Sequence, residues 1–163
     1  MAEEFCQWKG GHLPTEAQWE KAARGGCGIV APESCGPEDE RRFPWGNEDP
    51  SCERSNDSYD RCLPYMLTTE VGSYPPGMRP YGFCDMSGNV QEWVYDWFSE
   101  DYYSTGGPPW IDPQGPESGE NKIFRGGSYG TSGCRNYVMK RNDADPDRIY
   151  NDGGFRCAAE PVQ

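Results

Sequence analysis

The sequence has 163 residues, which suits one domain with a buried core. Aromatic residues make up 13% of it, a share typical of a folded chain and not of a disordered one. The formal net charge of −12 argues against nucleic acid or an anionic membrane as a partner, and no apolar run reaches the ~18 residues that a membrane span needs.

Two helices are expected near the N-terminus. Residues 2–8 have the pattern of a short helix, which a pair of glycines then stops. The second helix has clearer signals at both ends. Thr15 is a typical N-cap residue, Gln18 completes a capping box three positions later, and Gly25 ends the helix.

The rest of the chain is expected to be loop with a few short strands. Its 21 glycines and 15 prolines favour turns and interrupt regular elements. The pattern of apolar residues predicts strands at 71–76, 90–97, 123–129, 138–141 and 154–159. We interpret residues 1–163 as one mixed α/β domain with an unusual share of loop.

The eight cysteines predict disulfide bonds. None of them forms the Cys-x-x-Cys pair of a zinc site. Cys27 with Cys35, and Cys52 with Cys62, each bracket a loop rich in small and polar residues, as in disulfide-stapled surface loops. Disulfides imply an oxidising compartment, so we expect a secreted protein that is a piece of a longer precursor, since no signal peptide is visible. The alternative is a cytosolic protein with eight reduced cysteines.

The most informative stretch is residues 84–93, Cys-Asp-Met-Ser-Gly-Asn-Val-Gln-Glu-Trp. It places Asp85 and Glu92 on either side of a turn, because Gly88 is costly in a helix and Asn89 favours turns. Two carboxylates that converge here, with backbone carbonyls between them, form the all-oxygen ligand set that calcium prefers. The alternative is a pair of solvated acids beside a loop.

Six stretches, in this order, resemble the signatures of one protein family. They are residues 11–26, which contain Leu-Pro-Thr-Glu-Ala-Gln-Trp-Glu, 43–47 (Phe-Pro-Trp-Gly-Asn), 71–75 (Val-Gly-Ser-Tyr-Pro), 81–93, 125–129 (Arg-Gly-Gly-Ser-Tyr) and 154–156 (Gly-Phe-Arg). The family is that of the sulfatase-modifying factors, to which the formylglycine-generating enzyme belongs. The resemblance implies a fold related to the C-type lectin fold, with bound calcium. Family domains begin considerably earlier, with a strand-rich segment, so the chain resembles the C-terminal part of the domain.

The resemblance also implies the ligands of the calcium. One family site falls on Asp85 and Glu92, through side-chain oxygens, and on Gly88 and Val90, through backbone carbonyls. The other site is matched less completely, through Asn56.

The resemblance implies a disulfide bond as well. The family joins a cysteine near position 6 to the one in the Gly-Phe-Arg-Cys segment, which predicts the pair Cys6–Cys157. With the two loop pairs also removed, only Cys84 and Cys134 remain, and we expect them to be bonded by elimination alone.

The formylglycine-generating enzyme oxidises a substrate cysteine with oxygen and uses two thiols that bind copper(I), an ion suited to soft thiolates. The resemblance puts the first thiol position at Thr131 and the second at or beside Cys134. A hydroxyl cannot replace a thiolate on copper(I). The tryptophan inside the family's Asn-x-Trp-Glu-Trp motif is Gln91 here, and only Ser128 of that pocket's signature is kept. We therefore expect the oxidase reaction to be absent.

Two functions remain open at this point. The first is a secreted, calcium-stabilised binding or assembly module whose partner is a protein, a peptide or a second copy, displayed through loops 99–121 and 130–153. The alternative is a divergent copper-dependent oxidase that acts on a sulfatase cysteine through Cys134 and Ser128, with a second ligand from elsewhere.

Overall fold

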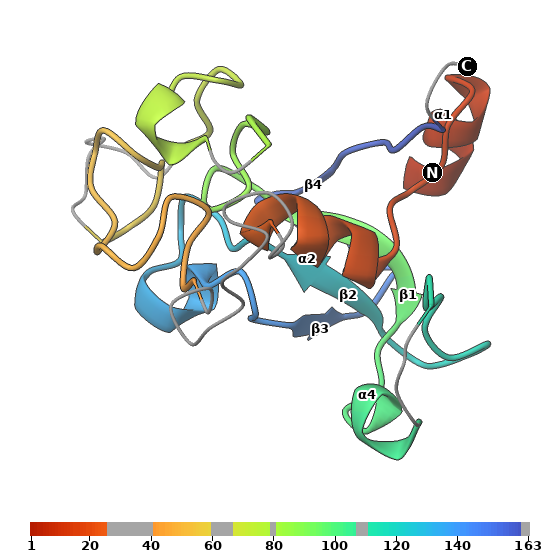
Figure 1. The fold of residues 1–163 in the computed structure, drawn as a ribbon. Helices are drawn as coiled ribbons and strands as arrows, with labels where there is room; N and C mark the ends of the chain where they lie inside the picture. Colours follow the sequence, from red (N-terminus) through yellow and green to blue (C-terminus); the bar gives the residue numbers. More distant parts are fainter. Residues whose placement is uncertain (26–40, 60–66, 79–80, 107–110, 161–163) are drawn as a thin grey trace.

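A small mixed sheet lies at the centre of the computed structural model, which describes residues 1–25, 41–59, 67–78, 81–106 and 111–160. Its strands are β1 (Gln91–Trp97), β2 (Lys122–Arg125), β3 (Asn142–Ala144) and β4 (Gly153–Phe155), in the spatial order β3-β2-β1-β4 (Figure 1). β2 is antiparallel to both of its neighbours, whereas β4 runs parallel to β1. The expected mixed α/β class is confirmed.

The helices that the structure describes are short. They are α1 (Ala2–Trp8), α2 (Glu16–Arg24), α4 (Tyr102–Thr105) and two 3-10 turns, η2 (Pro75–Gly77) and η3 (Gly133–Asn136). The predicted capping box of α2 is present, because the Gln18 N–H donates to Thr15 Oγ1 and the Thr15 N–H donates to Gln18 Oε1. None of the helices in these ranges is long and apolar enough to cross a membrane.

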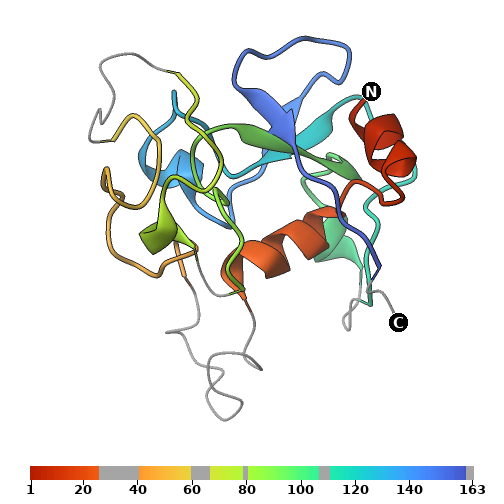
Figure 2. The same ribbon diagram turned by 90° about the horizontal axis from the view of Figure 1, so that it is seen from above.

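One face of the sheet packs against α2, which lies along it in Figure 2. Successive side chains of β1 point to opposite faces, so Glu92, Val94 and Asp96 are all buried. Val94 belongs to the hydrophobic core, which also contains Trp19, Ala23, Met86, Ile123 and Val138. The same face therefore carries one apolar residue between two buried carboxylates.

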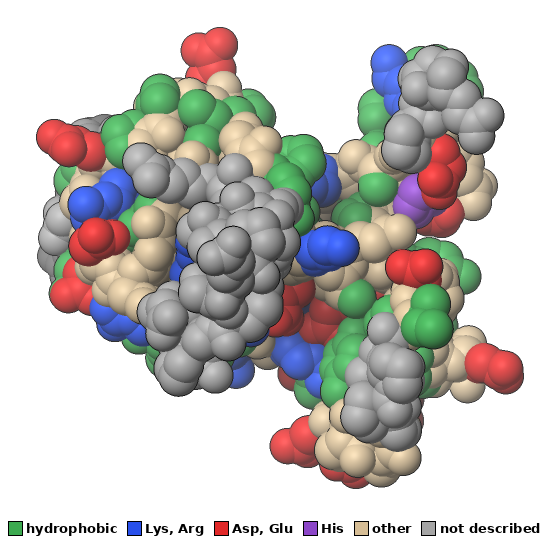
Figure 3. All heavy atoms as spheres, in the orientation of Figure 1, with side chains coloured by type: hydrophobic (Ala, Val, Ile, Leu, Met, Phe, Trp, Pro, Cys, Tyr) green, Lys and Arg blue, Asp and Glu red, His purple; other side chains and the backbone are tan. Residues whose placement is uncertain are grey.

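The predicted disulfide Cys6–Cys157 is confirmed, and it joins α1 to the segment after β4. Beside it, His12 and Ala158 exchange two backbone hydrogen bonds of 2.9 and 2.8 Å. Charged side chains of both signs are spread over the face of the molecule shown in Figure 3.

The prediction of a bond between Cys84 and Cys134 is wrong, because both thiols are free. Cys84 is half-buried with its sulfur 3.0 Å from that of Met78, whereas Cys134 is exposed in η3. Cys52 is disulfide-bonded. Its predicted partner, and the predicted pair of Cys27 with Cys35, lie outside the described residues.

Two of the predicted strands are wrong. Residues 71–72 form a turn, and Pro75 and Pro76 already belong to η2, since two consecutive prolines remove backbone donors from a ladder. Residues 138–141 precede β3 and do not belong to it. The carbonyls of Val138 and Lys140 accept hydrogen bonds from the buried Arg125 guanidinium, and this occupies groups that a strand would pair.

Candidate functional site

The turn before β1 has an unusual backbone. Asp85, Gly88 and Asn89 all have positive φ angles, of 55°, 84° and 62°. Aspartate and asparagine tolerate this region better than other side chains, and glycine adopts it freely. A Cβ on Gly88 would lie 2.5 Å from the backbone oxygen of Asn56, so only glycine fits at this point of the turn.

The structure brings Asn56 against this turn. Its backbone oxygen accepts from the Asn89 N–H at 2.7 Å, and its amide group donates to the Leu67 carbonyl at 2.8 Å. Asn89 in turn accepts from the Thr69 N–H at 3.0 Å. Asn56, which the sequence assigned to a separate site, is therefore part of the support of the Gly88 turn.

Glu92 is held by an ion pair. Arg156 donates from Nε and Nη2 to the two carboxylate oxygens, each at 2.6 Å, and Trp19 Nε1 donates to Oε2 at 2.7 Å. Burial is the largest single influence and lowers the pKa of Arg156, but the charge and hydrogen bond of Glu92, together with the charge of Asp85, give a net rise. Glu92 is only 5% exposed, so its charge is matched within the protein.

Asp85 has a different environment from Glu92. It is half-buried, and its Oδ2 accepts from the Gly72 N–H at 2.8 Å. The described part of the chain contains no group of three or more His, Cys, Asp or Glu side chains placed to hold a metal ion. Any cation at this turn therefore depends on Asp85 and on backbone carbonyls, with Glu92 shared with Arg156.

The segment after β2 forms a buried polar network beside the turn. Thr131 Oγ1 donates to Asn136 Oδ1, and it also accepts from the Ser128 N–H at 2.7 Å. Asn136 is fully buried, and a Cβ on Gly127 would lie 2.0 Å from its Oδ1. Ser87 of the turn donates to the Asn136 carbonyl at 3.1 Å, so the two candidate regions are in direct contact.

Ser128 is fully buried, and its hydroxyl donates to Asp152 Oδ2 at 2.7 Å. Gln91 donates to the other oxygen of Asp152 at 3.2 Å. This arrangement orients the serine hydroxyl toward an acceptor, but it contains no histidine that could remove the hydroxyl proton.

The family model of the sulfatase-modifying factor enzyme 1-like domain matches residues 1–161. The chain belongs to the sulfatase-modifying factor family. The family expected from the six sequence signatures is thus confirmed.

Two curated relatives and one solved structure illustrate the similarity. The formylglycine-generating enzyme of Thermomonospora curvata is 37% identical over 171 residues, 97% of this chain and 52% of that protein. Serine/threonine-protein kinase pkn1 of Chlamydia pneumoniae is 36% identical over 154 residues, 94% of this chain and 22% of the kinase. Treponema denticola variable protein 1 has a TM-score of 0.69 and 30% identity, over 92% of this chain and 48% of that one. The chain thus spans about half the length of that formylglycine-generating enzyme and less of the kinase.

The first of the two positions expected for the copper(I) thiolates holds no thiol in this sulfatase-modifying factor domain. The side-chain atoms that meet there are Thr131 Oγ1 and Asn136 Oδ1, which are hard oxygen donors. Cys134 lies between them in sequence but is exposed to solvent. One exposed thiol and a hydrogen-bonded hydroxyl do not make the pair of soft ligands that copper(I) needs, so the described residues do not fit this ion.

Several functional partners in the family domain were not predicted from its sequence. They are Trp19 and Arg156 around Glu92, and Asn136 and Asp152 around Thr131 and Ser128. Arg156 in the Gly-Phe-Arg segment was the one available signal. An arginine in a family motif is often buried, and a buried arginine is nearly always paired with a carboxylate.

Proposed function

We propose that this domain is a secreted, disulfide-stapled and calcium-stabilised module without copper oxidase activity. In this role it binds a protein or peptide ligand, or a second copy of itself. The observation that carries the proposal is the hydrogen bond between Thr131 and Asn136, because it occupies with hard oxygen donors the first of the two positions at which the reaction needs a thiolate.

Other observations support parts of this proposal. The Cys6–Cys157 bond and the bonded Cys52 favour an oxidising compartment and hence secretion. In the two loop regions, Ile111 is 80% and Ile149 93% exposed. Apolar side chains at loop tips are suited to contact with a protein partner, since binding removes them from water.

Calcium is proposed at the Asp85 turn. The chemistry of the donor set, a carboxylate with nearby backbone carbonyls, suits a hard cation. Asp85 would supply the charge, and Gly88 and Val90 the carbonyls. Because Glu92 is bound to Arg156, it would contribute only by sharing its carboxylate between the cation and the guanidinium.

A copper(I) titration against a competing chelator tests the loss of the oxidase site. We expect the unmutated protein to retain no stoichiometric copper(I), and Cys134→Ser to behave in the same way. The variant Thr131→Cys is the positive control, because it restores a thiol at the first expected position, near the free Cys134. Stoichiometric copper(I) on the unmutated protein that Cys134→Ser abolishes would overturn the proposal.

The second candidate function is an oxidase that acts on a cysteine of a protein substrate. The observation in its favour is Cys134, which is free and exposed. It predicts that the protein converts a cysteine-containing sulfatase peptide to the aldehyde in the presence of copper, oxygen and a thiol reductant that supplies the other two electrons for reduction of oxygen to water, and that Cys134→Ser does not. Mass spectrometry of the peptide distinguishes the two functions.

A further inference from the structure

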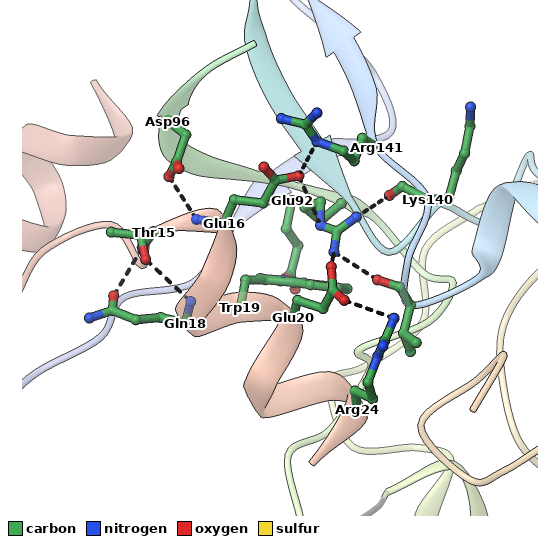
Figure 4. A network of polar contacts seen from close by, with 12 residues as sticks. Thr15, Glu16, Gln18, Trp19, Glu20, Arg24, Glu92, Asp96, Lys140 and Arg141 are labelled. Carbon is green, nitrogen blue, oxygen red and sulfur yellow. Dashed lines mark hydrogen bonds and ion pairs between the residues drawn. The ribbon is translucent and has the colours of Figure 1, made fainter. Parts of the chain in front are cut away.

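Asp96 is a carboxylate inside the protein. It lies on the face of β1 that packs against α2, and only 1% of its surface is exposed. Its Oδ2 accepts from the Glu16 N–H in the first turn of α2 at 2.7 Å (Figure 4). Asp96 therefore fixes the start of α2 to the centre of the sheet.

Glu16 is a second buried carboxylate close to Asp96, with 2% of its surface exposed. Its Oε1 accepts from Arg141 Nε at 2.7 Å and lies 3.7 Å from Arg125 Nε. Figure 4 shows that Arg141 approaches the Glu16 carboxylate on the side away from Asp96. The two arginines thus balance the charge of Glu16 but not that of Asp96.

Each carboxylate has one buried oxygen without a hydrogen-bond partner in the described structure, Oδ1 of Asp96 and Oε2 of Glu16. A buried acceptor without a donor is costly. Two ionised carboxylates cannot help each other, because both only accept hydrogen bonds. A proton on Asp96 lowers this cost, because it removes a buried charge that neither arginine balances and leaves the Oδ2 contact with the Glu16 N–H in place.

A loop segment covers the same carboxylate. Gly115 has a φ of +74°, and a Cβ there would lie 2.8 Å from the Asp96 Cβ and 2.9 Å from Oδ1. The C-terminal end of this segment is held next to the end of β1, because the Phe98 N–H donates to the Asn121 carbonyl at 2.8 Å. The segment 111–121 thus contacts Asp96 through Gly115, which brings no charge to balance the carboxylate.

We propose that Asp96 carries a proton in the folded protein, and that loss of this proton loosens the segment 111–121 and the first turn of α2. Asp96 is thus a proton-operated latch on one of the two loop regions.

The charges around the pair agree with this assignment. The pKa of Asp96 is raised from 3.8 to about 6, chiefly by burial and also by the charge of Glu16, against the Glu16 N–H and Lys122 of β2, which lower it. Tyr103 of α4, which also faces both carboxylates, has its pKa raised by burial and by their charges. The folded state therefore binds the proton more tightly than the unfolded state, so the latch contributes its stability below pH ~4 and loses it as the pH rises to about 6.

Carbon-13 NMR of the aspartate carboxyl groups in the unmutated protein tests the proton directly. We expect one aspartate to titrate near pH 6, and this signal to be absent in Asp96→Asn. If all folded-state aspartates titrate below pH ~5, the proposal is overturned. This measurement needs no variant to decide, so it holds even if Asp96→Asn does not fold.

Stability and loop exposure then test the consequence of the proton. From pH 4 to 7 the unfolding equilibrium constant of the unmutated protein should rise relative to that of Asp96→Asn, by on the order of a hundredfold, as the shift from 3.8 to about 6 implies. The control Asp147→Asn removes an exposed acid and should keep the unmutated pH profile. Over the same range, hydrogen exchange in residues 111–121 should accelerate relative to Asp96→Asn. Equal exchange in the two proteins at every pH would overturn the loop part of the proposal.

Discussion

Glu92 and Arg156 join β1 to the segment after β4 through two parallel hydrogen bonds of 2.6 Å. The same carboxylate receives the indole N–H of Trp19 on α2, so one side chain connects three parts of the fold. Because Glu92 is buried, its negative charge is tolerated only together with the positive charge of Arg156. Either charge without the other would strongly destabilise the fold. The residue that the sequence assigned to calcium thus has a structural role without any metal.

Glu92→Gln should destabilise the protein whether or not calcium is present. The change leaves the Arg156 guanidinium partly buried without its counter-charge, and we expect a loss of ~3–5 kcal/mol in the free energy of unfolding. Urea denaturation in calcium and in chelator measures it. The control Glu100→Gln, at an exposed position, should stay within ~0.5 kcal/mol of the unmutated protein. A loss that occurs only in calcium would mean that Glu92 is mainly a metal ligand.

Asp85→Asn should act on the calcium response alone. Asparagine tolerates the positive φ of this position and can still accept from the Gly72 N–H, but it lacks the charge that attracts the cation. We expect calcium to raise the melting temperature of the unmutated protein and not that of Asp85→Asn, while the two melt alike in chelator. Equal melting of the unmutated protein with and without calcium would remove the calcium assignment.

The features that the sequence predicted well depend on short-range signals or on family motifs. The capping box of Thr15 and Gln18 lies within four residues, and β1 was recognised from its apolar pattern. The Cys6–Cys157 bond came from the family resemblance, since nothing local pairs two cysteines that are 151 positions apart.

The features that were missed depend on contacts between distant residues. The third strand begins at residue 142 and not at 138, because the buried Arg125 donates hydrogen bonds to the carbonyls of Val138 and Lys140. Glu92 could not be separated from a metal ligand before its partner, 64 positions away, was known. The pairing of Cys84 with Cys134 was based on counting alone, and the structure places the first against Met78 and the second in solvent.

Thr15→Ala should remove the side-chain half of the capping box. The Gln18 N–H at the start of α2 then loses its acceptor, and we expect a loss of ~1 kcal/mol in the free energy of unfolding. Thr15→Ser keeps the hydroxyl and is the matched control, with an expected change of less than half of that. Urea denaturation measures both variants, and equal destabilisation by Ala and Ser would show that the Thr15 methyl group matters more than the cap.

Gly88→Ala should disrupt the turn that is proposed to bind calcium. Two effects add at this position, the positive φ of 84° and a Cβ that would lie 2.5 Å from the Asn56 backbone oxygen. The control Gly82→Ala has a similar φ of 78° but open space around its Cβ, so it measures the backbone strain alone. We expect Gly82→Ala to cost ~1 kcal/mol and Gly88→Ala several times as much, because backbone cannot move aside as a flexible side chain does. Thermal and urea unfolding of the two variants measure the difference. Equal losses of stability in the two variants would show that Asn56 moves aside freely. Its contact with the turn would then contribute nothing measurable to the free energy of unfolding.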